Sequence, residues 1–201
     1  MTVPVYVVGE DGICCALAKS LLSQTGGLGV AAYEKNASGF GEFVKVIPKM
    51  NQVAHTATAV LMLADGDQHS CVVQQINNWM PAHPANGFML RLAVREAESW
   101  ILADREGFGK FAEISPAVIP TQPDLLPYPK EALLALIGKS KRRILREEML
   151  PRKRSSAPVG LGYVLHLTDF LENYWCIKRA SEASPSLARS VVTVTSTLAA
   201  L

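Results

Sequence analysis

The sequence predicts an α/β fold, in which a mainly parallel sheet is flanked by helices and followed by a helical C-terminal extension. Short β-branched runs alternate with segments of helical spacing from residue 3 to about 112. A stretch with five prolines follows at residues 114–129, and beyond it the apolar residues recur only at helical spacing. Such alternation is typical of βαβ units, whose parallel strands form one sheet between two layers of helices.

The first strand is expected at residues 3–10, VPVYVVGE, because a β-branched run that ends in polar residues is typical of a buried parallel strand. Residues 11–24 carry Ile, Leu and Leu at helical spacing and predict a helix. A second strand is expected at 27–34, after a pair of glycines. Residues 39–55 predict a helix that is interrupted near Pro48.

Residues 57–67, ATAVLMLADGD, give the strongest signal of a buried strand in the chain. The segments after it are predicted as a helix at 69–80, a strand at 87–94, one helix at 95–112, a proline-rich connector, and helices at 130–150, 161–175 and 184–192. We therefore divide the chain into an α/β core at 1–115 and a helical region at 116–201 that packs on it.

Composition indicates a cytoplasmic protein that folds without disulfide bonds or a structural metal ion. A chain of 201 residues, of which 49% are hydrophobic, can bury a sizeable core. It has neither an apolar stretch near the roughly 18 residues that span a bilayer nor a signal peptide, so no membrane partner is expected. The four cysteines lack the spacing of a zinc site and are expected to be buried, reduced thiols.

Acidic residues follow three of the predicted strands. Glu10 ends the first strand, Asp65 and Asp67 end the strand at 57–67, and Glu96 and Glu98 follow the strand at 87–94. Because the carboxyl ends of parallel strands share one edge, these side chains are expected to converge there. Clustered carboxylates repel one another unless a cation neutralises them, and hard oxygen ligands favour Mg²⁺ or Mn²⁺. The sequence therefore predicts a metal site at this edge.

Structural roles for the same acids remain open. An alternative is that Asp65 caps the following helix and that Asp67 lies in solvent. Glu96 suits the first turn of a helix, where the macrodipole favours a negative charge. Glu98 points elsewhere on a regular helix, so one of these two glutamates is expected to be structural. His69 is the one histidine whose position suits the site, and Arg91, Arg95 and Lys110 are candidate phosphate clamps.

Glu10 in VVGED and Asp65 with Asp67 in LADGDQ resemble the metal site of the Toprim domain, the module of topoisomerases, primases and overcoming-lysogenization-type nucleases. A narrower resemblance covers almost the whole chain. The segments GFGEFVKVIPKMNQVA, ADGDQHSC, RLAVREAESWILADREGF, KSKRRILREEMLPR, VGLGYV and SPSLARS look like an uncharacterised bacterial Toprim-related family that is often encoded beside SMC-like or ABC-type ATPases in phage-defence loci. Two departures are Asp11 after Glu10, where Toprim domains commonly have Gly, and Ala64 in place of a more acidic lead.

The resemblance implies a Toprim-like fold and a metal-dependent nuclease with an ATPase partner. It implies that Glu10, Asp65 and Asp67 are catalytic and bind Mg²⁺ or Mn²⁺, with Glu96 and Glu98 completing the set of metal ligands. Two alternatives are kept. One is a non-catalytic module that binds nucleic acid or a protein partner. The other is a receiver-like phosphorylation switch built on Glu10, Asp11 and Asp65, which would leave Asp67 and the basic segment unexplained.

The segment at 139–154, KSKRRILREEMLPRKR, is strongly basic. Outside it, the chain holds 12 Lys or Arg against 16 Asp or Glu, a net charge of −4. A solvated helix face with an Arg143–Glu147 pair would explain part of this charge. We favour phosphate contacts, with DNA preferred over RNA and without base reading, since no aromatic residue is interleaved. The predicted nucleic-acid-binding residues are Lys139, Lys141, Arg142, Arg143, Arg146, Arg152, Lys153 and Arg154. An oligomer is compatible with the sequence.

Overall fold

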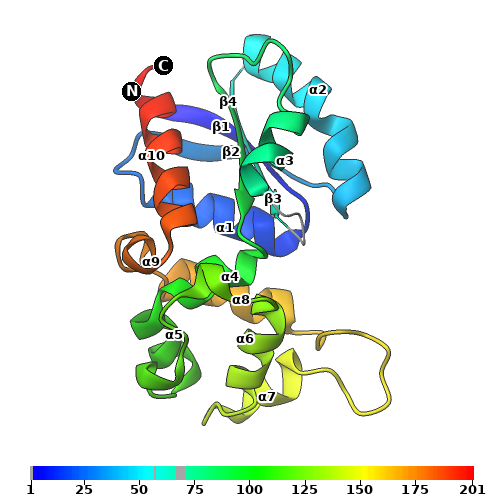
Figure 1. The fold of residues 1–201 in the computed structure, drawn as a ribbon, viewed down its shortest axis with the longest axis vertical. Coiled ribbons are helices and arrows are strands. Elements are labelled where there is room, and N and C mark those ends of the chain that lie inside the picture. The colour runs from blue at the N-terminus through cyan, green and yellow to red at the C-terminus, as the bar shows by residue number, and fades with distance from the viewer. Residues whose placement is uncertain (1, 57, 67–70) are drawn as a thin grey trace.

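The computed structural model describes residues 2–56, 58–66 and 71–201, and it shows an α/β sheet continuous with a group of helices (Figure 1). The described strands are β1 (Val3–Gly9), β2 (Gly29–Asn36), β3 (Ala59–Asp65) and β4 (Phe88–Ala93). All pairings are parallel, in the order β2-β1-β3-β4. The α/β fold with a parallel sheet predicted from the alternating pattern is therefore confirmed, and its order is that of a Rossmann-like doubly wound sheet.

Burial follows position in the sheet. The central strand β3 is buried over its six apolar residues, which explains its nearly continuous hydrophobic sequence. The edge strand β2 is exposed over most of its length. In β1 and β3, successive side chains enter two different hydrophobic clusters, as the twofold alternation of a strand requires.

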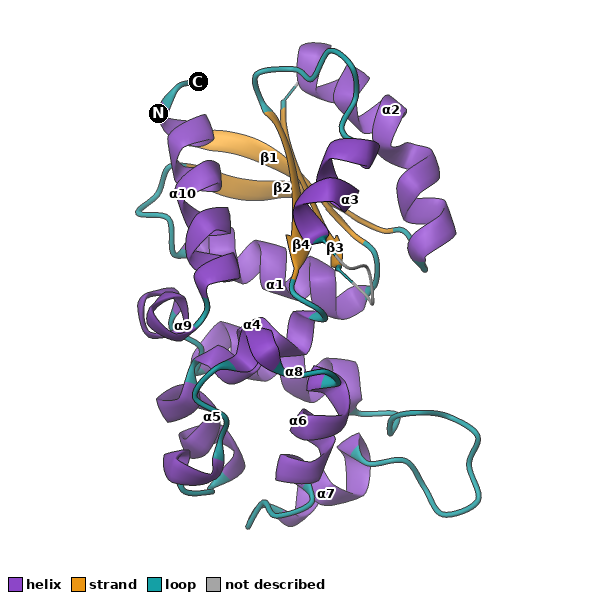
Figure 2. Cartoon of the chain, viewed as in Figure 1, coloured by secondary structure: helices purple, strands orange, loops and turns teal. Residues whose placement is uncertain are grey.

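Helices cover both faces of this sheet, as Figure 2 shows. On one face, α1 (Gly12–Ser23) and α10 (Pro185–Ala199) bury Leu17, Leu21 and Val194 against it. On the other face, α2 (Phe40–Thr56) buries Phe43 and Ile47, and α3 (Val72–Trp79) packs beside it. The last helix of the chain thus returns to a sheet built by the first half.

The remaining helices form a second group below the carboxyl edge of the sheet in Figure 1. They are α4 (Ala97–Ala103), α5 (Arg105–Ala112), α6 (Pro129–Ile137), α7 (Arg143–Met149), α8 (Tyr163–Asn173) and α9 (Ile177–Ala183), with the 3-10 turns Pro116–Val118 and Pro123–Leu125. Phe108, Phe111 and Phe170 pack edge to face or tilted at the centre of the group. Their cluster also contains residues of β1 and β3, so one hydrophobic core joins both groups. The domain boundary at residue 115 stays a prediction.

Several predicted element limits were wrong. Residues 95–112 form two helices, because Asp104 leaves the helical conformation and accepts a hydrogen bond from Gly107 N (3.0 Å) as the N-cap of α5. Helix α2 runs through Pro48 without interruption. The segment at 130–150 is likewise divided, into α6 and α7, and α9 was not predicted.

The thiol prediction holds only in part. All four cysteines are free; Cys14 and Cys15 are buried, whereas Cys71 is exposed and Cys176 is intermediate. Cys71 immediately precedes α3, a helix whose side chains are mostly on the surface. Within the described residues, every helix is too short or too polar to cross a bilayer.

Candidate functional site

The carboxyl ends of β1 and β3 form the topological switch point of the sheet, because the chain leaves β1 toward β2 on one side and β3 lies on the other. Ligands of doubly wound sheets bind in the crevice at this point. Glu10 follows β1, and its Oε2 accepts a hydrogen bond from Asp65 N at the end of β3 (3.2 Å). The structure thus brings together two of the predicted acids that lie 55 residues apart.

Asp65 also binds the start of the helical group. Its Oδ1 accepts a hydrogen bond from Ala97 N (2.7 Å), the first residue of α4, and lies 3.8 Å from the Cys14 thiol. The aspartate therefore caps α4, which is distant in sequence, rather than α3, which follows it. Gly66 is required next to it, since a Cβ at this position would lie 2.6 Å from Ala93 O. The glycine between the two aspartates thus allows the backbone to approach β4.

The two adjacent acids after β1 have different partners. The Asp11 side chain accepts a hydrogen bond from Cys14 N (2.8 Å) and caps α1. Glu10 instead faces Asp65. Of this pair, Glu10 is the acid whose side chain contacts the end of β3, whereas Asp11 acts on Asp65 through its charge.

Glu98 is buried beneath this edge, with 1% of its surface exposed. Its Oε1 accepts a hydrogen bond from the Tyr163 hydroxyl (2.7 Å) and lies 3.6 Å from Lys130 Nζ. Its Oε2 has no hydrogen-bond partner among the described residues. An unpaired buried carboxylate oxygen is costly, so this position favours either a proton or a further cation.

Glu96 has a structural contact. Its Oε2 accepts a hydrogen bond from Lys130 N (2.8 Å) in the first turn of α6. The glutamate thereby joins the start of α4 to the start of α6. Of the two glutamates, Glu98 is the one that interacts electrostatically with Asp65.

The charges at this edge are strongly coupled. Burial, and then the negative charge of Glu98, hold the pKa of Asp65 well above its ordinary value. Burial raises the pKa of Glu98 as well, although Lys130 and Tyr163 oppose the shift. Burial alone would lower the pKa of Lys130, but Glu98 and Asp65 outweigh it and raise the pKa of this ammonium group. The acids at this edge therefore outnumber the cations, and Lys130 balances only part of their negative charge.

Two predicted site residues, Asp67 and His69, lie outside the described residues. Across 2–56, 58–66 and 71–201, no group of three or more His, Cys, Asp or Glu side chains is arranged to hold a metal ion. Glu10 and Asp65 are in contact through the Glu10 carboxylate and the Asp65 backbone N–H, and in the sequence the third acid, Asp67, follows two residues after Asp65.

Sequence reasoning missed three members of this edge, namely Cys14, Lys130 and Tyr163. Cys14 lies in the first turn of α1, and burial raises its thiol pKa well above the ordinary value. Lys130 and Tyr163 come from the helical region, 65 residues or fewer from Glu98 but with no spacing that links them to it. No sequence signal would have identified them, because the contacts depend on how α6 and α8 pack below the sheet.

The basic segment does not form one surface. Arg142 donates to Phe111 O (3.1 Å) and its guanidinium lies 5.3 Å from the centre of the Phe111 ring. Arg146 donates to Ser140 O, and Arg143 pairs with Glu147 (2.6 Å) as the sequence suggested. The cations without such contacts in the described structure are Lys139, Lys141, Arg152, Lys153 and Arg154.

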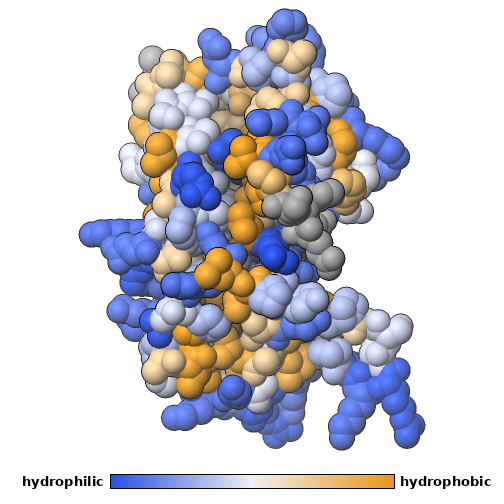
Figure 3. Space-filling model, in the orientation of Figure 1, coloured by the Kyte–Doolittle hydropathy of each residue, from blue (hydrophilic) through white to orange (hydrophobic). Residues whose placement is uncertain are grey.

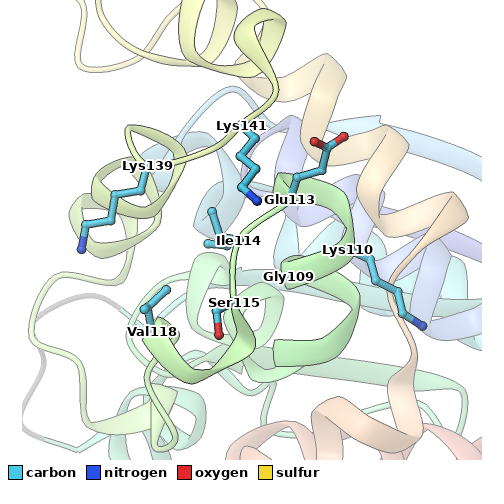
Figure 4. A pocket seen from close by; sticks show the side chains of 8 residues that line it. All are labelled: Gly109, Lys110, Glu113, Ile114, Ser115, Val118, Lys139 and Lys141. Atoms are coloured by element: carbon cyan, nitrogen blue, oxygen red, sulfur yellow. The ribbon is translucent and has the colours of Figure 1, made fainter.

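The candidate phosphate clamps lie elsewhere. Arg91 donates to Thr193 Oγ1 (3.1 Å) and lines a groove between α3 and α10. Lys110 lines an open hollow of about 770 Å³ at the far end of the helical group, together with Lys139 and Lys141. Figure 4 shows that Lys110 and Lys139 point to opposite sides of this hollow, so the lysines do not converge on one ligand. Arg95 is exposed at the start of α4.

The chain matches no protein-family model, no curated protein and no solved structure. At the switch point, Glu10 and Asp65 meet, Glu98 lies behind them, and Lys130 adds one cation. An edge with more carboxylates than cations favours an added positive charge.

Proposed function

We propose that this protein is a Mg²⁺-dependent nuclease subunit with a Toprim-like site that cleaves phosphodiester bonds. The observation that carries the proposal is the contact between Glu10 Oε2 and Asp65 N (3.2 Å) at the switch point of the sheet. Asp67 lies two residues beyond Asp65, within reach of the same crevice by sequence. A basic segment supplies charge for a polyanionic substrate.

The donor set fits a hard divalent cation. Glu10, Asp65 and Asp67 would hold Mg²⁺ or Mn²⁺ through carboxylate oxygens, and the ion would supply charge stabilisation at the phosphate. Burial, and then the charge of Glu98, raise the pKa of Asp65, so a proton or an added cation would stabilise this carboxyl group. The unpaired Glu98 Oε2 supports the same conclusion.

The chain's own residues would orient the site. Ala97 N fixes Oδ1 of Asp65, and Tyr163 fixes Oε1 of Glu98. Lys130, whose side chain is 32% exposed, would attract a substrate phosphate toward the acids. In this arrangement Glu98 acts through Asp65 and Lys130, and Glu96 holds α6 in place.

Cleavage assays test the proposal directly. Purified protein is incubated with supercoiled plasmid and with RNA, with Mn²⁺, Mg²⁺ or EDTA. We expect metal-dependent cleavage that Asp65→Asn and Asp67→Ala abolish, whereas the matched surface variant Asp169→Asn keeps it, because Asp169 lies on α8 and bonds only Asn173 (2.8 Å) in the described structure. Undiminished cleavage by a folded Asp67→Ala protein would exclude the catalytic assignment.

A partner is part of the proposal. The family resemblance suggests an SMC-like or ABC-type ATPase and a role in phage defence. The cleavage assay is therefore repeated with an added SMC-like or ABC-type ATPase from the same organism. Activity that needs this ATPase and its ATP would support a shared complex.

A non-catalytic module that binds nucleic acid or a protein partner is the second candidate. It is favoured by the structural contacts of the acids, since Asp65 caps α4 and Glu96 binds the start of α6. It predicts nucleic-acid or partner binding without cleavage under any metal condition. The assay above separates the two candidates.

A further inference from the structure

The fold divides the basic segment into three groups of cations. Lys139 and Lys141 are exposed and line the open hollow beside Lys110. Arg142, Arg143 and Arg146 have partners within the chain: Arg142 contacts Phe111 of α5, Arg146 contacts Ser140 in the loop before α7, and Arg143 pairs with Glu147 within α7. Arg152, Lys153 and Arg154 lie in the loop at residues 151–162, which we call the arm. All three are exposed, and none has an ion pair or a side-chain hydrogen bond with the described residues. Three adjacent unpaired cations repel one another and favour an anionic partner.

The arm projects from the helical group between α7 and α8, at the lower right of Figure 1. Its base is closed by hydrogen bonds from Gly160 N to Met149 O (2.8 Å) and from Gly162 N to Glu148 O (2.9 Å). A Cβ at Gly160 would lie 2.1 Å from Glu148 O, so the close approach requires glycine. The base is thus fixed, although the loop extends into solvent, and strongly hydrophilic side chains extend from the same part of Figure 3.

The base of the arm also touches the acidic edge. Tyr163 follows it directly and donates to buried Glu98 (2.7 Å). Val164 Cγ1 lies 3.1 Å from the position that a Cβ on Gly12 would occupy, next to the Asp11 cap of α1. A polymer bound along the arm would therefore reach the carboxyl edge of the sheet at the base of the arm.

Apolar side chains are exposed at the same place. Leu161 is 90% exposed and Leu165 is 68% exposed, on either side of the buried Tyr163. Leu161 belongs to the base of the arm, and Leu165 lies in the first turn of α8. A phosphate backbone binds the cations, whereas its sugars and base faces can cover leucine side chains.

We propose that the arm, and not helix α7, binds nucleic acid and holds it against the acidic edge. Arg152, Lys153 and Arg154 contact phosphates, and Leu161 contacts the sugar or base face of the same strand. The inference rests on the nucleic-acid substrate of the proposed function and assigns it a surface. It does not require that the isolated chain cleaves.

Two variants with equal charge loss test the arm. One carries Arg152→Gln, Lys153→Gln and Arg154→Gln; the control carries Lys139→Gln, Lys141→Gln and Arg143→Gln, all exposed positions. Binding to a fluorescein-labelled duplex of mixed sequence is followed by anisotropy in EDTA over a salt series. We expect the arm variant to reduce the slope of log affinity against log salt by about 2.7, the value for three phosphate contacts, and the control by less than half as much. Equal reductions, or a larger one for the control, would overturn the assignment.

Leu161→Ser tests the apolar contact. Because Leu161 is 90% exposed, the substitution leaves folding intact. We expect about fivefold weaker binding, corresponding to partial burial of one leucine, with no change of the salt slope. The matched variant Leu125→Ser, at a leucine that is 73% exposed in a 3-10 turn, should bind as the wild type does. If the Leu161→Ser variant binds the duplex with unchanged affinity, Leu161 is not part of the nucleic-acid-binding surface.

The design keeps the two proposals separate. Binding in EDTA involves no cleavage. A salt slope that depends on the arm would therefore support the arm even if the protein shows no metal-dependent cleavage. Metal-dependent cleavage that is insensitive to the arm variant would overturn the arm and leave the acidic site. If the arm variant changes neither the affinity for nucleic acid nor the salt dependence of that affinity, the inference is wrong.

Discussion

At the scale of single residues, Asp65 is subject to two opposing effects. Its Oδ1 accepts the Ala97 N–H, which stabilises an acceptor at this position. Burial and the Glu98 charge disfavour its ionised form. Asparagine keeps the acceptor and removes the charge. We therefore expect Asp65→Asn to raise the melting temperature of the metal-free protein and to abolish the stabilisation that Mn²⁺ gives the wild type.

Thermal melts of both proteins in EDTA and in millimolar Mn²⁺ provide the measurement. For the wild type, a hundredfold excess of metal over its dissociation constant corresponds to about 2.7 kcal/mol of stabilisation. A role as a helix cap alone would give a different pattern, because asparagine is also a good cap and metal would then affect neither protein. A wild type without any metal-dependent rise would contradict the metal site.

The pH dependence of Asp65 has a definite sign. Because its pKa is raised in the folded protein, the folded state retains the proton at pH values where the unfolded state, with a pKa of about 3.9, has lost it. The free energy of unfolding of the metal-free wild type should therefore fall as pH rises above about 4. Asp65→Asn cannot titrate and should show a flatter profile, measured by urea unfolding across this range. Glu98 also has a pKa raised by burial, so Asp65→Asn should keep a smaller slope that comes from this glutamate.

Tyr163 provides a second test at the residue scale. Its hydroxyl donates to Glu98 Oε1, whose partner oxygen Oε2 is already unpaired among the described residues. Tyr163→Phe should therefore destabilise the protein by about 1–3 kcal/mol, because it leaves a buried carboxylate with one donor fewer. Tyr128→Phe, at a tyrosine that is 56% exposed, should change stability by less than about 0.5 kcal/mol. Equal effects of the two variants in urea unfolding would contradict the importance of the Glu98 bond.

At the scale of elements, Asp104 explains why residues 95–112 form two helices. Its carboxylate caps α5 through Gly107 N, accepts from Cys176 N (2.8 Å) before α9, and binds Arg179 through two hydrogen bonds of 2.7 and 2.6 Å. The side chain is fully buried. One residue therefore sets the ends of three helices. This is why periodicity, which sees only a continuous apolar pattern, predicted one.

Asp104→Ala should therefore strongly lower the free energy of unfolding. It removes one partner of a buried ion pair, for which about 3–5 kcal/mol of destabilisation is typical. Asp104→Asn is the matched control, since it keeps an acceptor for Gly107 N but not the charge opposite Arg179, and we expect an intermediate loss. Chemical unfolding of the three proteins gives the comparison. A loss below about 1 kcal/mol for Asp104→Ala would show that the pair is replaced by solvent.

At the scale of the whole molecule, local patterns predicted what depends on neighbours in sequence. The buried run of β3 and the alternation of strands and helices gave the parallel sheet, and the sheet in turn placed Glu10 beside Asp65. Contacts between distant segments were not predictable. The hydrogen bonds from Ala97 N to Asp65, from Tyr163 to Glu98 and from Arg142 to Phe111 O join elements whose packing no periodicity encodes.

The basic segment shows the same limit. As a run of charges it predicted one phosphate-binding surface of eight cations. In the fold, contacts with backbone carbonyls occupy Arg142 and Arg146, while the cations of the arm remain exposed. Sequence alone records the charge of a side chain but not whether the fold has already supplied its partner.

The sheet and the helical group should unfold as one unit. A single hydrophobic cluster contains Val5 and Leu61 of the sheet, Phe170 of α8, and Leu198 of α10. We therefore expect one transition, in which far-UV circular dichroism and tryptophan fluorescence give the same midpoint. The fluorescence reports on both regions, because Trp79 lies in α3 whereas Trp100 and Trp175 are buried in the helical group.

Two core variants sharpen this last expectation. Phe170→Ala empties the centre of the helical group, and Leu198→Ala removes a side chain that packs on β1 and on Gly29 of β2 from the opposite end of the core. Each should lower stability by about 2–5 kcal/mol. In a cooperative molecule, each also shifts the circular dichroism and fluorescence midpoints together. The contrary result would be that Phe170→Ala separates the two midpoints, with the sheet melting later than the helices. The helical group would then be an independent domain, because the interface through α1, α4 and α10 would be too weak to couple it to the sheet.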